Sequence, residues 1–233
     1  MPASLPTAVL FDLDGTLLDT IPDLAQATNA MRQDLGLAIL DQAVITSYVG
    51  KGTENLVMRA LANNPGGVQP SADEVKQGLA LFNRHYHDCN GKNAVLYPGV
   101  LEGLQAFKAA GCKLAVVTNK PTEFTLPLLE RSNLAAFFDQ IICGDTCEQK
   151  KPHPMPFLHA CSLLGVQPEQ ALAVGDSIND ALSARAAGIP VLAVPYGYNE
   201  GMDVQDLPVD DIVTSIAEAA RWAANRTNAH QTP

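Results

Sequence analysis

The sequence predicts an α/β protein in which a doubly wound parallel sheet is interrupted by an inserted, all-helical block. Three observations lead to this expectation. The apolar run Ala8–Phe11 has the length of a buried strand and ends in a polar turn that begins with Asp12. From residue 97 onward, further short apolar runs alternate with helix-like segments. Between these regions, residues 21–95 contain helix-like stretches but no convincing strand.

The expected elements follow in chain order. After the strand Ala8–Phe11, the helical block contains helices over Asp23–Leu35, Glu54–Leu61 and Asp73–Tyr86. The alternating region then contains helix Leu101–Ala110, strand Lys113–Thr118, helix Glu123–Ser132, strand Gln140–Cys143, helix Pro156–Leu164, strand Ala171–Gly175, helix Ala181–Ala187, strand Val191–Val194 and helix Ile212–Ala224. A parallel connection needs a crossover of a dozen or more residues, so these helices are expected to cover both faces of one sheet.

The helical block predicts two domains. We place the boundaries near Thr20 and Leu96, so that residues 1–20 and 96–233 form the core domain and residues 21–95 form a helical cap domain. Pro98-Gly99 is the expected hinge between them.

The composition is that of a chain that folds completely. The 233 residues suffice for one large core or for a core with a smaller unit attached, since single cores seldom grow beyond about 250 residues. Hydrophobic residues make up 47% and charged residues 17%, against a usual charged share of about 25%. The net charge of −10 repels a phosphate backbone, which disfavours nucleic acid as a partner. A small anion can still bind where a metal ion or a few cations reverse the local field.

Targeting and redox signals are absent from the sequence. No segment combines the basic stretch and apolar run of a signal peptide, and no apolar run approaches the roughly 20 residues that span a bilayer. We therefore expect a cytoplasmic protein that does not bind membranes. The five cysteines are scattered and form no Cys-x-x-Cys pair, so we expect buried thiols rather than disulfides or a zinc site.

Polar residues gather where the predicted strands end. In doubly wound sheets, ligands bind outside the carboxyl ends of the strands, so these side chains are expected to meet at one edge. They are Asp12 and Asp14 after the first strand, Thr118, Asn119 and Lys120 after the second, Asp145 and Thr146 after the third, and Asp176 and Ser177 after the fourth.

Carboxylates at this edge predict a divalent metal ion. Residues two apart in an extended chain point the same way, so Asp12 and Asp14 can both face the site and repel each other. Asp176 and Asp180 can add two more carboxylates, and oxygen ligands of this kind suit Mg²⁺. An alternative is that Asp176 and Asp180 only cap a helix N-terminus. Likewise, Thr118-Asn119 could be ordinary turn residues and Lys151 a solvated side chain.

Four motifs resemble those of the haloacid dehalogenase-like (HAD) superfamily, in the same order and across nearly the whole chain. They are Asp12-Leu13-Asp14-Gly15-Thr16, Val117-Thr118-Asn119, Lys151-Pro152-His153-Pro154 and Gly175-Asp176-Ser177-Ile178-Asn179-Asp180. The opening Val9–Thr20 and the stretch Tyr196-Gly197-Tyr198-Asn199 further resemble the bacterial phosphoglycolate phosphatase family. The resemblance implies a Rossmann-like core and phosphoryl transfer through an aspartyl-phosphate intermediate.

The resemblance also implies catalytic roles. Asp12 would be the nucleophile, and Asp14 would protonate the leaving oxygen and then activate water. Thr118 and Asn119 would bind the phosphoryl oxygens, and Lys151 would neutralise charge on Asp12 and the phosphate. A carboxylate nucleophile divides one difficult hydrolysis into two easier displacements.

For the metal, the resemblance implies Mg²⁺ as the cofactor. Its ligands would be the Asp12 carboxylate, the Asp14 backbone carbonyl and Asp176, with Asp180 as a further or water-mediated ligand. Phosphoryl transfer depends mostly on positioning and charge neutralisation, which Mg²⁺ and Lys151 together would supply.

The helical insertion resembles the cap of the superfamily's small-molecule phosphatases, and this resemblance narrows the choice of substrate. A cap that closes over the site limits substrate size, which favours a small phosphorylated metabolite over a polymer. Lys51, in the loop Gly50-Lys51-Gly52, is the candidate to pair with a substrate carboxylate, although an exposed glycine-flanked turn explains that loop equally well. Arg32 and Arg84 are expected to lie on solvated helix faces.

The resemblance to phosphoglycolate phosphatases implies 2-phosphoglycolate, hydrolysed to glycolate and phosphate, as the substrate. N-acetylmuramate 6-phosphate and other sugar phosphates are the alternatives. A non-catalytic protein that binds a phosphorylated metabolite is the competing class of function, but a pure binder has no need of both Asp12 and Asp14. The resemblance leaves a monomer and a homodimer equally open.

Overall fold

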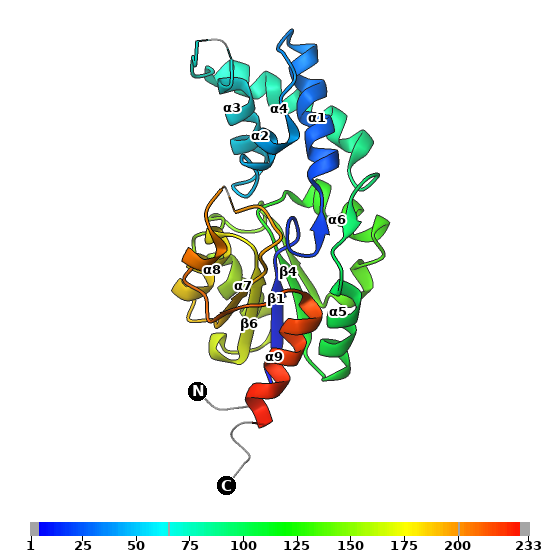
Figure 1. Cartoon of the computed structure of the whole chain (residues 1–233), viewed down its shortest axis with the longest axis vertical. Helices are drawn as coiled ribbons and strands as arrows, with labels where there is room; N and C mark the ends of the chain where they lie inside the picture. Colours follow the sequence, from blue (N-terminus) through cyan, green and yellow to red (C-terminus); the bar gives the residue numbers. More distant parts are fainter. Residues whose placement is uncertain (1–4, 65, 200, 229–233) are drawn as a thin grey trace.

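The computed structural model describes residues 5–64, 66–199 and 201–228. Its main sheet has six parallel strands in the order β5-β4-β1-β6-β7-β8, which confirms the predicted α/β fold (Figure 1). The strands are β1 (Ala8–Phe11), β4 (Lys113–Val117), β5 (Gln140–Ile142), β6 (Ala171–Gly175), β7 (Val191–Ala193) and β8 (Asp211–Ile212). Because β1 is flanked by β4 and β6, the direction of winding reverses beside it.

Helices cover both faces of this sheet (Figure 1). One face packs on α5 (Val100–Ala109), α6 (Thr122–Arg131) and α9 (Ile216–Asn228), and the other on α7 (Met155–Leu164) and α8 (Ile178–Ala186). In β1, Val9 and Phe11 point to the first face, whereas Ala8 and Leu10 point to the second. With both faces buried, β1 is apolar at every position.

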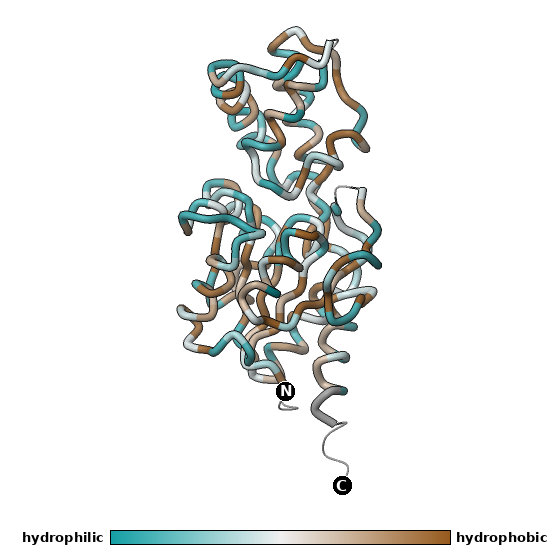
Figure 2. Tube along the Cα trace, turned by 90° about the vertical axis from the view of Figure 1, so that its left-hand side faces the viewer, coloured by the Kyte–Doolittle hydropathy of each residue, from teal (hydrophilic) through white to brown (hydrophobic). Residues whose placement is uncertain are grey.

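Four helices between residues 21 and 89 pack on one another at the carboxyl end of the sheet (Figures 1 and 2). They are α1 (Ile21–Asp34), α2 (Gln42–Thr46), α3 (Thr53–Ala62) and α4 (Ala72–Cys89). Met31, Val57 and Phe82 lie at the centre of their shared apolar cluster, each fully buried. The start of α4 is fixed by reciprocal hydrogen bonds, in which the Ser71 hydroxyl accepts from the Glu74 N–H and the Glu74 carboxylate accepts from the Ser71 N–H.

Two short antiparallel strands, β2 (Leu18–Asp19) and β3 (Val95–Leu96), carry the chain between the sheet and these helices. The Tyr198 hydroxyl donates to Asp19 Oδ1 at 2.7 Å and accepts from the Thr20 N–H at 2.8 Å. The loop after β7 therefore holds the segment that leads from β2 into the helices. The buried Asp23 holds the returning segment before β3, because the Asp23 carboxylate accepts four hydrogen bonds from residues 91, 93 and 94.

The helix predicted over Ile212–Ala224 is wrong at its start. Asp211–Ile212 forms β8, which pairs with β7, and α9 begins only at Ile216. The N–H and hydroxyl of Thr214 both donate to Glu218 Oε2 at 2.6 Å. These hydrogen bonds join the residues that precede α9 to its first turn. A strand of two residues is too short to show a period of its own.

The expectation that Arg32 is solvated is also wrong, since only 2% of this residue is exposed. Its guanidinium donates to the backbone carbonyls of Ala38, Ala60 and Asn63. Two of these carbonyls lie at the C-terminal end of α3, where helix carbonyls lack partners and a positive charge is favourable. Arg84 is exposed, as predicted, and pairs with Asp34.

The prediction for the cysteines is confirmed. All five cysteines are free thiols, and four of them are buried. Among the described residues, no helix is both long enough and apolar enough to cross a membrane.

Candidate active site

The motif residues meet at the carboxyl edge of the sheet, where the winding reverses. Asp12 and Asp14 follow β1, Thr118 follows β4, Asp176 follows β6, and Asp180 lies in the first turn of α8. This edge is where doubly wound sheets bind ligands. The chain therefore brings together, across more than half of its length, residues that the sequence placed at separate strand ends.

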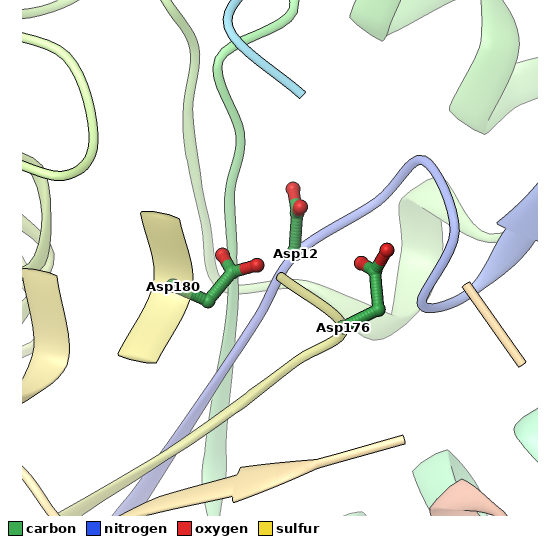
Figure 3. Close-up of side chains that lie close together, drawn as sticks. All are labelled: Asp12, Asp176 and Asp180. Carbon is green, nitrogen blue, oxygen red and sulfur yellow. The ribbon is translucent and has the colours of Figure 1, made fainter. Parts of the chain in front are cut away.

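Three carboxylates form a tight cluster. Ligand oxygens of Asp12, Asp176 and Asp180 lie within 4.8 Å of one another, and the three side chains form one group (Figure 3). Burial and the neighbouring Asp180 raise the pKa of Asp12 above its usual range. Burial, followed by the charges of Asp12 and Asp180, raises the pKa of Asp176. The cluster thus holds more negative charge than its own surroundings neutralise.

Lys151 supplies one positive charge to this cluster. Its ammonium lies 3.0 Å from Asp12 Oδ1 and 2.6 Å from Asp180 Oδ1, and it donates to the Val117 carbonyl at 2.7 Å. Burial opposes the charged form, but the attraction of Asp12 and Asp180 outweighs it and holds the pKa of Lys151 above its usual range. The three donors of the ammonium are therefore all used.

The donor set fits a hard divalent cation. Two buried carboxylates and one partly buried carboxylate lie together, and Lys151 pairs with two of the three, so a cation among them would relieve a repulsion that otherwise drives protonation. Carboxylate oxygens are the ligands that Mg²⁺ takes in proteins, usually with water and substrate oxygens. The cluster could hold a metal ion on these grounds.

Asp176 is held rigidly from two sides. The Thr16 hydroxyl donates to Oδ1 at 2.7 Å, and the Tyr198 N–H donates to Oδ2 at 2.6 Å. Glycines make room for it: a Cβ on Gly197 would lie 2.3 Å from the Asp176 side chain, and one on Gly15 would lie 2.5 Å from it. Gly15 also has a φ of +86°, which favours glycine. Asp176 is therefore oriented toward the cluster rather than used as a helix cap.

Asp180 both caps a helix and contributes charge to the site. Its Oδ2 accepts from the N–H and hydroxyl of Ser177, at 3.2 and 2.7 Å, and so caps α8. Its Oδ1 pairs with Lys151. The capping interpretation and the charge interpretation of this residue are compatible.

Asp14 lies beside a second buried lysine, Lys120. Its Oδ1 accepts from the Thr20 hydroxyl at 2.6 Å and lies 3.0 Å from the Lys120 ammonium. Lys120 also donates to the hydroxyl of Tyr86, in α4, at 2.6 Å. The helical insertion thus contacts the neighbourhood of Asp14 through one tyrosine.

Asn119 joins the loop of Lys151 to the helical insertion. Its side-chain amide accepts from the Lys151 N–H and donates to the carbonyls of Lys151 and Gly50, at 2.9, 2.9 and 3.1 Å. A Cβ on Gly52 would lie 3.3 Å from the Asn119 carbonyl oxygen, so this glycine permits the close approach of the loop. The side-chain amide is therefore occupied by backbone groups.

A small cavity of about 50 Å³ lies between the insertion and the sheet edge. The core contributes polar residues to its wall: Asp12, Asp14, Thr118, Asn119, Lys120, Asp176, Ser177 and Tyr198. The insertion contributes mostly apolar ones: Leu24, Val49, Gly50, Gly52, Thr53, Leu56 and Tyr86. Lys51 is exposed and is not among the described lining residues, so its pairing with a substrate stays a prediction.

Sequence reasoning assigned no role to Thr16, Thr20, Tyr86, Lys120 or Tyr198. Thr16 lies in the first motif, Lys120 was among the polar residues expected at the sheet edge, and Tyr198 lies in a stretch that carries the family resemblance, so position was their only signal. Tyr86 reaches the site from the helical insertion, and no local pattern marks it.

Comparison with known proteins agrees with this geometry. The sequence model of the family described as haloacid dehalogenase-like hydrolase matches residues 9–194. The chain belongs to this family. The matched range contains all four motifs, and the fold is of the expected class.

Relatives of this HAD-like hydrolase match it over almost their full length. A phosphoglycolate phosphatase of Nitrosospira multiformis is 51% identical, with 92% of this chain and 94% of the relative covered. A phosphoglycolate phosphatase of Thiobacillus denitrificans is 46% identical, with 91% and 93% covered. The crystal structure of a predicted phosphoglycolate phosphatase from Haemophilus somnus 129pt superposes with a TM-score of 0.87 at 34% identity, with 95% and 99% covered.

Proposed function

We propose that this HAD-like hydrolase is a phosphoric monoester hydrolase that converts 2-phosphoglycolate to glycolate and phosphate. The substrate assignment rests on sequence identity to two proteins named phosphoglycolate phosphatase. This identity is 51% and 46%, over more than nine-tenths of the chain. The carboxylate cluster beside a small, covered cavity supports the chemistry.

In the first half of the reaction, a carboxylate oxygen of Asp12 attacks phosphorus. The bond from phosphorus to the ester oxygen breaks, and Asp14 gives its proton to that oxygen, which releases glycolate. Asp12 then carries the phosphoryl group as a mixed anhydride, and Asp14 is a carboxylate. The side chain of Asp14 is suited to this task because Thr20 and Lys120 fix its position.

In the second half, water attacks the same phosphorus atom and Asp14 accepts a proton from it. The bond from phosphorus to Asp12 breaks, which returns Asp12 as a carboxylate and Asp14 as an acid, and releases inorganic phosphate. Lys151 offsets charge on Asp12 and on the phosphoryl group throughout. Thr118 and Asn119 bind phosphoryl oxygens, Asn119 through its backbone because its side-chain amide is occupied.

The proposed cofactor is Mg²⁺, held by the carboxylates of Asp12 and Asp176 and the backbone carbonyl of Asp14, with Asp180 as a further or water-mediated ligand. When bound, it supplies positive charge that draws the anionic phosphate to an acidic site and stabilises charge during transfer.

We further propose that residues 21–95 act as a cap domain on a core of residues 1–20 and 96–233. The apolar wall that α1 and α3 add to the cavity excludes water and bulky alcohols. This size limit favours 2-phosphoglycolate over N-acetylmuramate 6-phosphate and hexose phosphates.

The experiment is a comparison of kcat/KM across phosphate esters with Mg²⁺ present. We expect 2-phosphoglycolate to exceed glucose 6-phosphate and N-acetylmuramate 6-phosphate by at least about tenfold, and chelation to abolish activity. Equal kcat/KM values for all esters would refute the assignment of 2-phosphoglycolate as the substrate. No phosphate release from any ester, with Asp12→Asn indistinguishable from wild type, would favour the non-catalytic binding protein instead.

A further inference from the structure

The cavity wall carries little positive charge for a substrate that is anionic at both ends. Of the described residues that line it, Lys120 alone has a cationic side chain. Lys151 lies behind the wall, 2% exposed, and its three donors are used by Asp12, Asp180 and the Val117 carbonyl. A substrate carboxylate can therefore find a partner among these lysines only at Lys120.

Lys120 is held between Asp14 and Tyr86 at the cavity wall. Its side chain is 5% exposed, and its ammonium donates to Asp14 Oδ1 and Oδ2 at 3.0 and 3.3 Å and to the Tyr86 hydroxyl at 2.6 Å. The Tyr86 ring also lies against the ammonium, with 4.8 Å between the nitrogen and the ring centroid. Two of these three hydrogen bonds go to one carboxylate, and the longest of them, to Asp14 Oδ2, is the one that a substrate carboxylate would replace. Lys120 is thus a buried, firmly held cation in the wall of the cavity.

We propose that Lys120 binds the carboxylate of the substrate and selects esters whose carboxylate is attached to the carbon that bears the phosphate. This inference rests on the proposed function, since Asp14 must contact the ester oxygen to protonate it. In 2-phosphoglycolate, the ester oxygen and the carboxyl carbon are bonded to the same carbon. A cation 3.0 Å from Asp14 Oδ1 is therefore within reach of that carboxylate.

The rest of the cavity supports this assignment. The helical insertion adds Leu24, Val49 and Leu56 to the wall, and none of them can pair with a carboxylate. Lys51 and Lys150 are exposed and lie outside the described lining. Burial makes the Lys120 charge strong, because an ion pair shielded from water is screened less than one at the surface.

The test compares two esters of similar size, 2-phosphoglycolate and 2-hydroxyethyl phosphate, which differ in the carboxylate. The measured quantity is the ratio of their kcat/KM values, because loss of the Lys120 contact to Asp14 affects both esters alike. Lys120→Met removes the charge and Lys120→Arg retains it. Lys51→Met tests the competing assignment of the carboxylate to Lys51, and Lys150→Met is the matched control. Turnover of 2-hydroxyethyl phosphate also reports whether a variant is folded.

We expect Lys120→Met to lower the ratio about 100-fold, mainly through a higher KM for 2-phosphoglycolate. Lys120→Arg should keep at least a tenth of the wild-type ratio, and the control Lys150→Met should leave it unchanged. A ratio unchanged in Lys120→Met, or one that falls only in Lys51→Met, overturns the assignment. A wild-type enzyme with no preference for 2-phosphoglycolate contradicts the proposed function itself and removes the basis of the assignment.

Discussion

Replacing Asp12 with asparagine separates the charge of the carboxylate cluster from its hydrogen bonds. Asp12 Oδ1 accepts from the Leu13 N–H at 2.7 Å and lies 3.0 Å from the Lys151 ammonium. An asparagine can place its amide oxygen there and keep both contacts. The second oxygen of Asp12 accepts from no other described residue, so an NH₂ group in its place displaces no donor.

The magnitude follows from the distances in the cluster. Asp12 lies within 4.8 Å of both Asp176 and Asp180, so each repulsion is about 3 kcal/mol or more at an effective dielectric constant of about 20. The attraction to Lys151, at 3.0 Å, is about 5 kcal/mol on the same scale, and burial adds a desolvation penalty for the charged form. We therefore expect Asp12→Asn to be about 1–3 kcal/mol more stable than the metal-free wild type.

The assay is equilibrium unfolding in urea, with a chelator, at pH 5 and pH 8. Because the pKa of Asp12 is raised in the folded state, the wild type loses stability as the pH rises above the usual carboxyl value of 3.8. The gain in Asp12→Asn should therefore be larger at pH 8 than at pH 5. Mg²⁺ should stabilise the wild type more than the variant. A variant less stable than the chelated wild type at pH 8 would refute this reasoning.

Three other substitutions test separate parts of the site. Gly197→Ala puts a Cβ 2.3 Å from the Asp176 side chain and should weaken Mg²⁺ binding at least about tenfold in calorimetric titration. Asp23→Asn places an NH₂ group among N–H donors and should lower the free energy of unfolding by about 2–3 kcal/mol in urea titration. Tyr86→Phe removes an acceptor from Lys120 and should lower kcat/KM for 2-phosphoglycolate about 5- to 10-fold in steady-state assays.

Each of these three substitutions has a control in which the same type of change is made away from the site or contact tested. A Cβ on Gly111 meets open space, so Gly111→Ala should leave Mg²⁺ affinity unchanged. Asp73 is exposed, and Asp73→Asn should change stability by no more than about 0.5 kcal/mol. The Tyr48 hydroxyl accepts from Asn63, neither of which lines the cavity, so Tyr48→Phe should leave kcat/KM unchanged. An effect in a control equal to that of its partner would contradict the specific cause given for it.

Long, buried elements could be predicted from the sequence, whereas very short ones could not. The strand Ala171–Gly175 has the bounds that its apolar run indicated, because a strand buried on both faces must be apolar throughout. By contrast, β2, β3 and β8 have two residues each and exist through pairing with neighbours that lie far away in the sequence. No local period marks such segments.

Some features of the site could likewise be predicted from the sequence, whereas others could not. The motifs indicated the segments that meet at the sheet edge, and Asp12, Asp176 and Asp180 do form one cluster. The contact from Lys120 to Tyr86 depends on how the helical insertion folds over the sheet, so it could not be predicted from either segment. Arg32 is buried because it reaches the last carbonyls of α3, which only the packed structure brings near it.

The central claim is that Asp12 carries the phosphoryl group. A single turnover with ³²P-labelled 2-phosphoglycolate and Mg²⁺, quenched in acid within milliseconds, tests it directly. We expect protein-bound label that hydroxylamine releases, and borohydride reduction should convert residue 12 to homoserine. Asp12→Asn should carry no label. Label on another residue, or phosphate release in the first turnover with no protein-bound label at any time, would contradict the claim.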